Sequence, residues 1–165
     1  MQGNETPLGP ASNGEASSHS QAPRISLVTH AQISAELAEG TRSQDEILEQ
    51  HGYLPEEWQT ATIHWMGQLG EDVQTNGAQA ELPLVYSDAF ARRQNELAAT
   101  PSITPEQWAE LQFDIEKEGG LEVPLGSRQL SLPDYFRLVR HYSKRLAEDP
   151  GTQLRYSTRI EELRQ

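Results

Sequence analysis

The feature that most constrains this chain is a short pattern that occurs twice in the same order. The segment 63–72 aligns with the segment 140–149, so that a histidine, an aromatic residue, a leucine and an acidic pair fall in register. His64 and His141 are the first matched pair. This repetition predicts that the chain contains two diverged copies of one helical unit.

Two further matches lie upstream of this pattern in each copy. Leu54-Pro55 is matched by Leu132-Pro133, and Thr29 is matched by Thr104. The order of the matches is preserved, and their separation along the chain changes only slightly, between one element and the next. We therefore interpret the pattern as an internal duplication in which loops have changed length.

Helix-start signals precede the apolar stretches of both copies. Thr104-Pro105-Glu106-Gln107 is a capping box with proline at the first helical position, and Thr29–Gln32 has the same form. Ser43–Glu46 predicts another short helix in the first copy. Its counterpart, 120–126, is rich in glycine and contains a proline, so we expect a loop or extended segment there.

The third element of each copy has apolar residues at helical spacing. In the first copy these are Trp58, Ala61, Trp65, Met66 and Leu69; in the second they are Phe136, Val139, Tyr142 and Leu146. A fourth element is expected from about Leu82 to Ala98, and its counterpart from about Thr152 to the C-terminus. No segment alternates with period two, so the prediction is an all-α fold of six or seven helices packed as a bundle.

Three regions follow from this organisation. Residues 1–24 are polar and rich in Gly, Ser and Pro, and we expect a disordered tail there. Residues 25–99 form the first helical unit and residues 101–165 the second. The tail has neither the basic start nor the apolar stretch of a secretory signal.

The charge of the chain narrows the classes of partner. Its formal net charge is −12, from 13 basic and 25 acidic residues. Such a charge disfavours nucleic acid and acidic membranes and would attract a basic protein. The chain has no cysteine and no run of about 20 apolar residues. We therefore predict a cytoplasmic protein whose partner is another protein, with no nucleic acid and no membrane bound.

The histidines are the first residues to consider for catalysis or metal binding. His64 and His141 each precede an acidic residue by seven positions, too far along a helix for a compact chelate. No His-Glu-x-x-His pattern and no nucleophile motif occurs. We expect no metal, no cofactor and no catalytic residue, and interpret both histidines as edge residues of the core.

Acidic pairs at helix ends and on polar faces are the candidates for partner binding. Tyr135 joins them because it falls beside the apolar stripe of its helix and could be an exposed anchor. The candidate partner-binding residues are Glu56, Glu57, Glu71, Asp72, Tyr135, Glu148 and Asp149. Arg137, Arg140, Lys144 and Arg145 are either a docking patch or, as we favour, neutralise nearby acids.

The first unit resembles a group of small bacterial helical proteins found in the gene neighbourhoods of secretion systems and toxins. The resemblance covers most of residues 26–97 and, more faintly, 101–165, where it is interrupted between Gly119 and Leu130. Its marker residues are Ile47, Leu48, His51, Gly52, Trp58, Trp65, Leu69, Glu71 and Asp72. The resemblance implies a non-catalytic protein that binds another protein.

The leading hypothesis is therefore a protein-binding module, such as an adaptor, a chaperone-like factor or an immunity protein of a bacterial secretion or toxin system. Two alternatives stay open. One is a structural or scaffolding component recruited through the tail, and the other is a metal protein or enzyme that uses His64 and His141.

Overall fold

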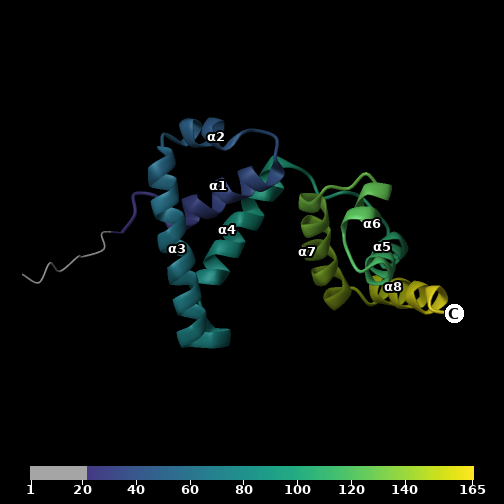
Figure 1. The fold of residues 1–165 in the computed structure, drawn as a ribbon. Helices are drawn as coiled ribbons and strands as arrows, with labels where there is room; N and C mark the ends of the chain where they lie inside the picture. The colour runs from purple at the N-terminus through teal and green to yellow at the C-terminus, as the bar shows by residue number, and fades with distance from the viewer. Residues whose placement is uncertain (1–21) are drawn as a thin grey trace, which may run out of the picture.

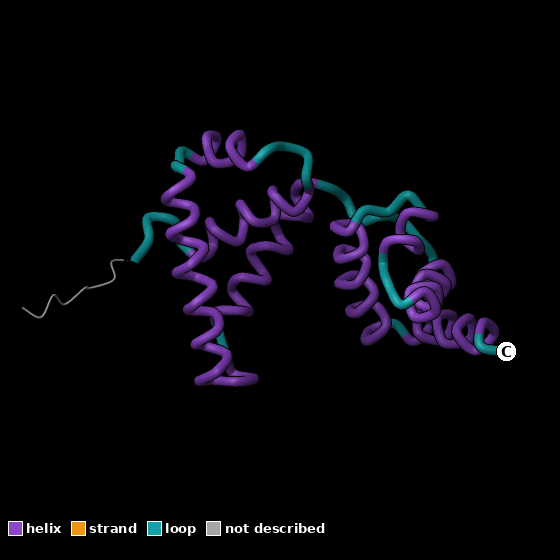
Figure 2. The backbone as a smooth tube through the Cα atoms, in the orientation of Figure 1, coloured by secondary structure: helices purple, strands orange, loops and turns teal. Residues whose placement is uncertain are grey.

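The computed structural model describes residues 22–165, and every regular element in that range is helical. Helices α1–α4 form one group and helices α5–α8 another, and a short linker joins the two groups (Figures 1 and 2). The α-helices are α1 (Leu27–Glu39), α2 (Gln44–His51), α3 (Pro55–Asn76), α4 (Leu82–Leu97), α5 (Pro105–Glu118), α6 (Glu122–Ser127), α7 (Leu132–Glu148) and α8 (Pro150–Leu163). A 3₁₀ turn, η1 (Gly77–Gln79), separates α3 from α4.

The all-α prediction is confirmed, but the predicted number of helices is wrong. The additional helix is α6, in the segment that was expected to lack one. Its proline, Pro124, lies in the first turn, where a missing N–H costs no helical hydrogen bond. Leu125 is buried among Trp108 and Leu111, so packing stabilises a helix that local propensity disfavours.

The start of α1 also differs from the prediction. Ser26, not Thr29, is the N-cap: its side chain accepts a hydrogen bond from the Thr29 backbone N–H at 3.1 Å. The Thr29 hydroxyl lies 2.8 Å from the Ser26 hydroxyl. The helix begins earlier because Ile25 and Leu27 are both buried, which holds this first turn against the core. The predicted capping boxes at Ser43 and Thr104 are both present.

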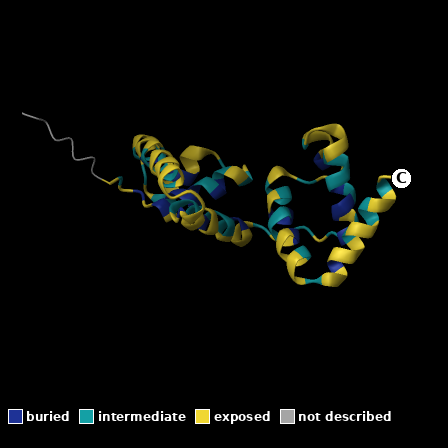
Figure 3. Ribbon diagram, turned by 90° about the horizontal axis from the view of Figure 1, so that it is seen from below, coloured by how far each residue is buried: buried dark blue, intermediate teal, exposed yellow. Residues whose placement is uncertain are grey.

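The first four helices have their own apolar core. The core is formed by Ile33, Ile47 and Leu48, with Trp58 packed against it. The largest contact between helices is that of α1 with α4, and the fully buried alanines of α1, Ala31 and Ala35, keep that side of the helix small. Figure 3 shows buried residues on the inward sides of the helices and exposed residues on their outward sides.

The last four helices have a larger aromatic core. It consists of Trp108, Leu111, Leu125, Leu138 and Tyr142. The Trp108 and Tyr142 rings stack with centroids 5.2 Å apart. Here α5 packs chiefly on α8, while the largest contact between the two groups of helices is that of α4 with α7.

The apolar stripe predicted for the third element of the first unit is only partly buried. Of its residues Ala61 alone is fully buried, while Trp58, Trp65 and Leu69 are half-buried and Met66 is exposed. The C-terminal part of α3 extends beyond α1 and α2, and its main neighbours in the described part of the chain are α4 and η1 (Figure 1). A long helix with few neighbours cannot bury a complete stripe.

The predicted tail lies almost entirely outside the described residues. At its end, Arg24 donates to Glu57 at 2.9 Å and lies over the Tyr53 ring, so this residue belongs to the folded part. Within residues 22–165, no helix combines the length and the apolar character that crossing a membrane requires.

Candidate functional site

The acidic residues predicted on α3 divide into two that hold the fold and two that face solvent. Glu57 accepts hydrogen bonds from the Leu54 backbone N–H and from Arg24, both at 2.9 Å. These contacts lower the pKa of Glu57, the Leu54 hydrogen bond most strongly. The Glu57 carboxylate is therefore engaged at the helix start, where it also interacts favourably with the helix dipole.

Asp72 has a similar structural task near the end of α3. It accepts hydrogen bonds from the side chain of Asn76 at 2.6 Å and from the Leu82 backbone N–H at 2.8 Å. These hydrogen bonds, led by that of Asn76, lower the pKa of Asp72. Asp72 thereby ties the end of α3 to the start of α4.

Glu56 and Glu71 are exposed and form no ion pair with any residue of the described range. Glu71 accepts a single hydrogen bond, from Gln68 at 3.1 Å. Both carboxylates are consequently available to a basic partner. On α3, they are the members of the predicted acidic pairs that the fold does not already use.

Three exposed apolar residues form a row along α3, beside the line of Glu56. Ile63 is 69% exposed, Met66 46% and Val73 50%. Glu56 and Ile63 are seven positions apart, two helical turns, and so lie in line along the helix. Large apolar side chains exposed together on one helix are typical of a protein-interaction surface.

The acidic pair at the end of α7 is divided in the same way. Asp149 is the N-cap of α8: it accepts from the Gly151 backbone N–H at 3.0 Å and from the Thr152 hydroxyl at 2.6 Å. The contacts with Thr152, foremost among several, lower the pKa of Asp149 to about 2. Asp149 also pairs with Arg145, whereas Glu148 is exposed.

Tyr135 does not lie free on the surface as expected of an anchor. It is half-buried against the aromatic core, with its ring centroid 6.0 Å from that of Trp108. Its partner-binding role stays a prediction, but most of its ring is already used in packing. The exposed neighbour is Phe136, which lies one position further along the helix.

A buried carboxylate that the sequence analysis did not single out lies between α1, α2 and α4. Glu36 is only 1% exposed and contacts three side chains: Arg42 at 2.5 Å, Arg93 at 2.8 Å and His51 at 3.0 Å. Burial raises its pKa, but the hydrogen bonds from His51 and Arg93 outweigh that effect and the pKa is lowered. These residues are distant in sequence, so no local motif marks them.

The histidines considered for metal binding lie in different groups of helices. His64 and His141 each pack edge-on against the next residue, Trp65 and Tyr142, with ring centroids 4.7 and 5.0 Å apart. In the described range, no group of three or more histidine, cysteine or acidic side chains is placed to hold a metal ion. Among the histidines of residues 22–165, His30 is the buried one, and it stacks on Trp58 with ring centroids 4.3 Å apart.

No family model matches the chain, and no curated protein or solved structure is significantly similar to it. Function must therefore be inferred from the arrangement of its own residues.

Proposed function

We propose that the protein is a non-catalytic binding module that docks a basic protein partner on the outward side of α3. The observation that carries this proposal is the row of exposed apolar residues Ile63, Met66 and Val73, with the Glu56 carboxylate beside it and the Glu71 carboxylate further round the helix. Neither carboxylate has an ion-pair partner among residues 22–165. We call these five residues the α3 face.

The apolar residues of the α3 face would supply most of the affinity. Exposed aliphatic side chains release water when a partner covers them, at about 25 cal/mol per Å² of apolar surface. The C-terminal part of α3 has few neighbours of its own, which leaves the helix open to a partner helix or extended segment.

The carboxylates would supply steering and orientation. With a net charge of −12, the chain attracts a basic partner at long range, and this attraction weakens as salt is added. Glu56 and Glu71 are the residues that act in this way on the α3 face, because Glu57 and Asp72 are occupied by contacts within the fold. Glu148 is the corresponding exposed carboxylate on α7.

The chain is proposed to have arisen by duplication. Three observations support this proposal. The N-caps Ser26 and Thr104 have the same separation along the chain as the first residues of α2 and α6. Trp65 donates to the Ile25 carbonyl at 2.9 Å, and Tyr142 donates to the Ile103 carbonyl at 2.5 Å. In both groups, this hydrogen bond joins the third helix to the residue two positions before the start of the first helix. The third observation is that the first helix packs chiefly on the fourth helix in each group.

A role as an adaptor, chaperone-like factor or immunity protein of a bacterial secretion or toxin system is the more specific form of the proposal. It is supported by the helix pattern and marker residues described above. A small acidic helical protein that covers a basic partner suits each of these roles.

The experiment is affinity capture of the tagged full-length chain from its native cell, followed by mass spectrometry. The informative comparison is between the unchanged chain, the variant Ile63→Ser/Met66→Ser and the control Glu161→Lys on α8. Glu161 is exposed and remote in sequence from α3, so this control reverses a charge without touching the α3 face. Circular dichroism would verify that all three chains fold.

The proposal predicts a stoichiometric partner that is retained by the control and lost from the α3 variant. A second variant, Glu56→Lys/Glu71→Lys, should weaken capture more at low salt than at moderate salt. Retention of every partner by both α3 variants would refute the assignment to α3. Absence of any partner at either salt concentration would refute the binding-module proposal itself.

A further inference from the structure

We infer that the cavity between α4 and α7 binds a small carboxylic acid with an apolar body, such as a medium-chain fatty acid. This inference is independent of the proposed protein-binding function and concerns a different surface. It depends on the shape of the cavity, its apolar walls and two polar side chains at one end.

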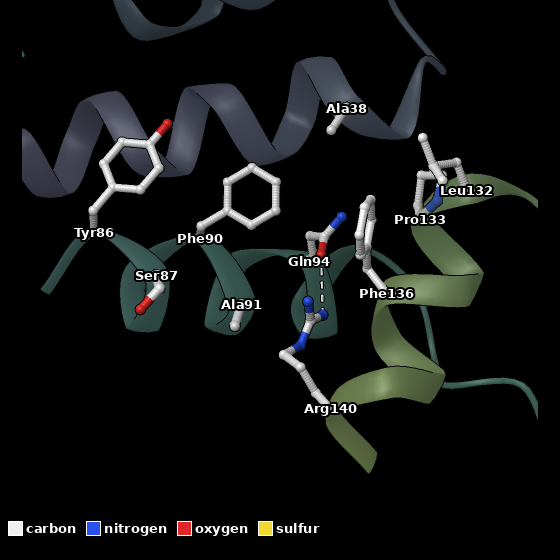
Figure 4. A pocket seen from close by; sticks show the side chains of 10 residues that line it. All are labelled: Ala38, Tyr86, Ser87, Phe90, Ala91, Gln94, Leu132, Pro133, Phe136 and Arg140. Atoms are coloured by element: carbon white, nitrogen blue, oxygen red, sulfur yellow. Dashed lines mark hydrogen bonds between the residues drawn. The ribbon is translucent and has the colours of Figure 1, made fainter. Parts of the chain in front are cut away.

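The cavity has a volume of about 420 Å³ and its walls are almost entirely apolar. Tyr86, Phe90 and Ala91 of α4 form one wall, and Leu132, Pro133 and Phe136 of α7 form the other. Figure 4 shows these side chains on the two helices, with Ala38 of α1 above them. Volumes of about 300–1,000 Å³ are usual for small-molecule sites.

The polar end of the cavity is formed by Gln94 and Arg140. Arg140 donates from Nη2 to the Gln94 side-chain oxygen at 2.9 Å, the contact drawn as a dashed line in Figure 4. Gln94 is fully buried, and its side-chain nitrogen has no hydrogen-bond partner in the described range. A buried amide N–H₂ left without an acceptor is costly, so its position indicates a missing acceptor.

Arg140 also lacks a carboxylate partner within the part of the chain that the structure describes. The contrast with Arg137, one turn earlier on α7, is direct. Arg137 pairs with Glu39 at 2.5 Å and with Asp134 at 2.9 Å, which neutralises its charge. Burial, together with the charge of Arg137, lowers the pKa of Arg140. A bound anion would offset both the burial of the Arg140 charge and its repulsion by Arg137.

These features select the ligand. A carboxylate can accept hydrogen bonds from the Arg140 guanidinium and from the Gln94 amide at the same time, since it has two oxygens. The apolar walls suit an alkyl chain or ring, and they disfavour a ligand that is polar throughout. The positive charge of a basic ligand would be repelled by the Arg140 guanidinium at the polar end of the cavity, so basic ligands are excluded.

Isothermal titration calorimetry with the full-length chain and octanoate tests the inference. The comparison ligands are 1-octanol and octylammonium, which keep the alkyl chain but change the head group. Octanoate should bind with one site per chain and at least about tenfold more tightly than 1-octanol, because a hydrogen-bonded charge is worth about that factor. Octylammonium should bind more weakly than both.

Two variants separate the site from nonspecific binding. Arg140→Gln should weaken octanoate binding by about tenfold or more and change 1-octanol binding little. The matched control is Arg92→Gln on α4, whose exposed side chain pairs with Asp88 outside the cavity; it should leave both affinities unchanged. Chemical-shift changes in the Phe90 and Phe136 rings on adding octanoate would place the ligand between α4 and α7.

Three results would overturn the inference. They are no saturable octanoate binding at millimolar concentration, equal affinity for octanoate and 1-octanol, and unchanged octanoate affinity in Arg140→Gln. Formation of a dimer that is lost in Phe136→Ser and unaffected by octanoate would instead assign this surface to a second copy of the chain.

Discussion

The two groups of helices stabilise similar arrangements with different chemistry. In the first group, Glu36 of α1 is buried among Arg42, His51 and Arg93. At the matching position of the second group, counted from the N-cap of its first helix, the Asp114 side chain of α5 is 41% exposed. Among the described residues it pairs with Arg128 alone, at 2.6 Å. One group therefore contains a buried charge network, and the other has a simple surface ion pair.

The aromatic residues show the opposite trend. His30 of α1 stacks on Trp58, whereas Trp108, at the matching position of α5, stacks on Tyr142 in a core with more aromatic surface. The second group also joins α5 to α8 by ion pairs near the surface, in which Arg155, Arg159 and Arg164 contact Glu106, Glu110 and Glu116. The same arrangement of four helices can therefore be stable with either a polar or an aromatic interior, provided that each buried charge is paired.

The largest expected difference between the groups comes from the aromatic residue that fastens the third helix. Tyr142→Ala should lower the free energy of unfolding by about 4 kcal/mol, because this fully buried ring would leave a cavity. Trp65→Ala should cost about 2 kcal/mol, since Trp65 is half-buried. Urea unfolding followed by circular dichroism measures both values.

Tyr142→Phe is the control for this comparison. It keeps the ring and removes the hydroxyl that donates to Ile103, so it should cost about 1 kcal/mol. Equal losses for Tyr142→Ala and Trp65→Ala would mean that the two cores contribute equally, contrary to their burial.

The second comparison concerns the charge network. Glu36→Ala should lower the free energy of unfolding by about 3 kcal/mol, because it leaves Arg93 and His51 without their buried acceptor. Asp114→Ala, at the matching position, should cost less than about 1 kcal/mol, as is usual for an exposed ion pair. Hydrogen exchange measured by mass spectrometry would locate each effect in α1–α4 or in α5–α8.

A loss for Asp114→Ala as large as that for Glu36→Ala would contradict the proposed difference. Faster exchange throughout both groups in Glu36→Ala would show instead that the groups unfold as one unit.

The third comparison uses pH. Burial lowers the pKa of His30 from its ordinary value of 6.5, whereas Trp108 at the matching position does not titrate. As the pH falls below about 6.5, the unfolded chain therefore binds the proton before the folded chain does, and stability decreases. His30→Gln should reduce this decrease between pH 7 and pH 5, as measured by urea unfolding at each pH. An identical pH dependence in both chains would exclude His30 as its source.

The smallest expected effect is at the surface of the second group. The Arg155 guanidinium, the largest of several influences, lowers the pKa of Glu106 to about 2, so the charged form is favoured down to low pH. Glu106→Gln should reduce the melting temperature slightly at pH 7, less than any variant above, and the difference should vanish as the pH falls from 4.5 towards 2. Scanning calorimetry of both chains would measure it; a difference that persists at pH 2 would argue against the ion pair.

Much of the helical structure could be predicted from local sequence. The capping boxes at Ser43 and Thr104 and the terminating glycines Gly40 and Gly119 determined helix boundaries, since both act within a single turn. The start of α1 was misplaced because two hydroxyl residues three positions apart, Ser26 and Thr29, could each serve as its cap. Burial of Ile25, which is not a local property, decided between them.

The candidate site was predictable only in part. Acidic pairs could be located on α3 from the sequence, but their division into engaged and exposed carboxylates depends on distant partners. Arg24, which precedes α3 by about 30 residues, donates a hydrogen bond to Glu57. The Leu82 backbone N–H, which lies beyond the loop that follows α3, donates one to Asp72. The exposure of Met66, which helical spacing had assigned to the core, depends on how far α3 extends past its neighbours.

The sequence by itself determined that this chain is helical, where most helices begin and end, and that it is strongly acidic, because capping, periodicity and charge are properties of short segments. Tertiary structure alone decided that α6 forms, that Glu36 is buried among three cationic or titratable side chains, and that Arg140 lies beside an apolar cavity. Each of these depends on helices that are far apart in the chain, and only their packing determines which side chains meet and which are excluded from water.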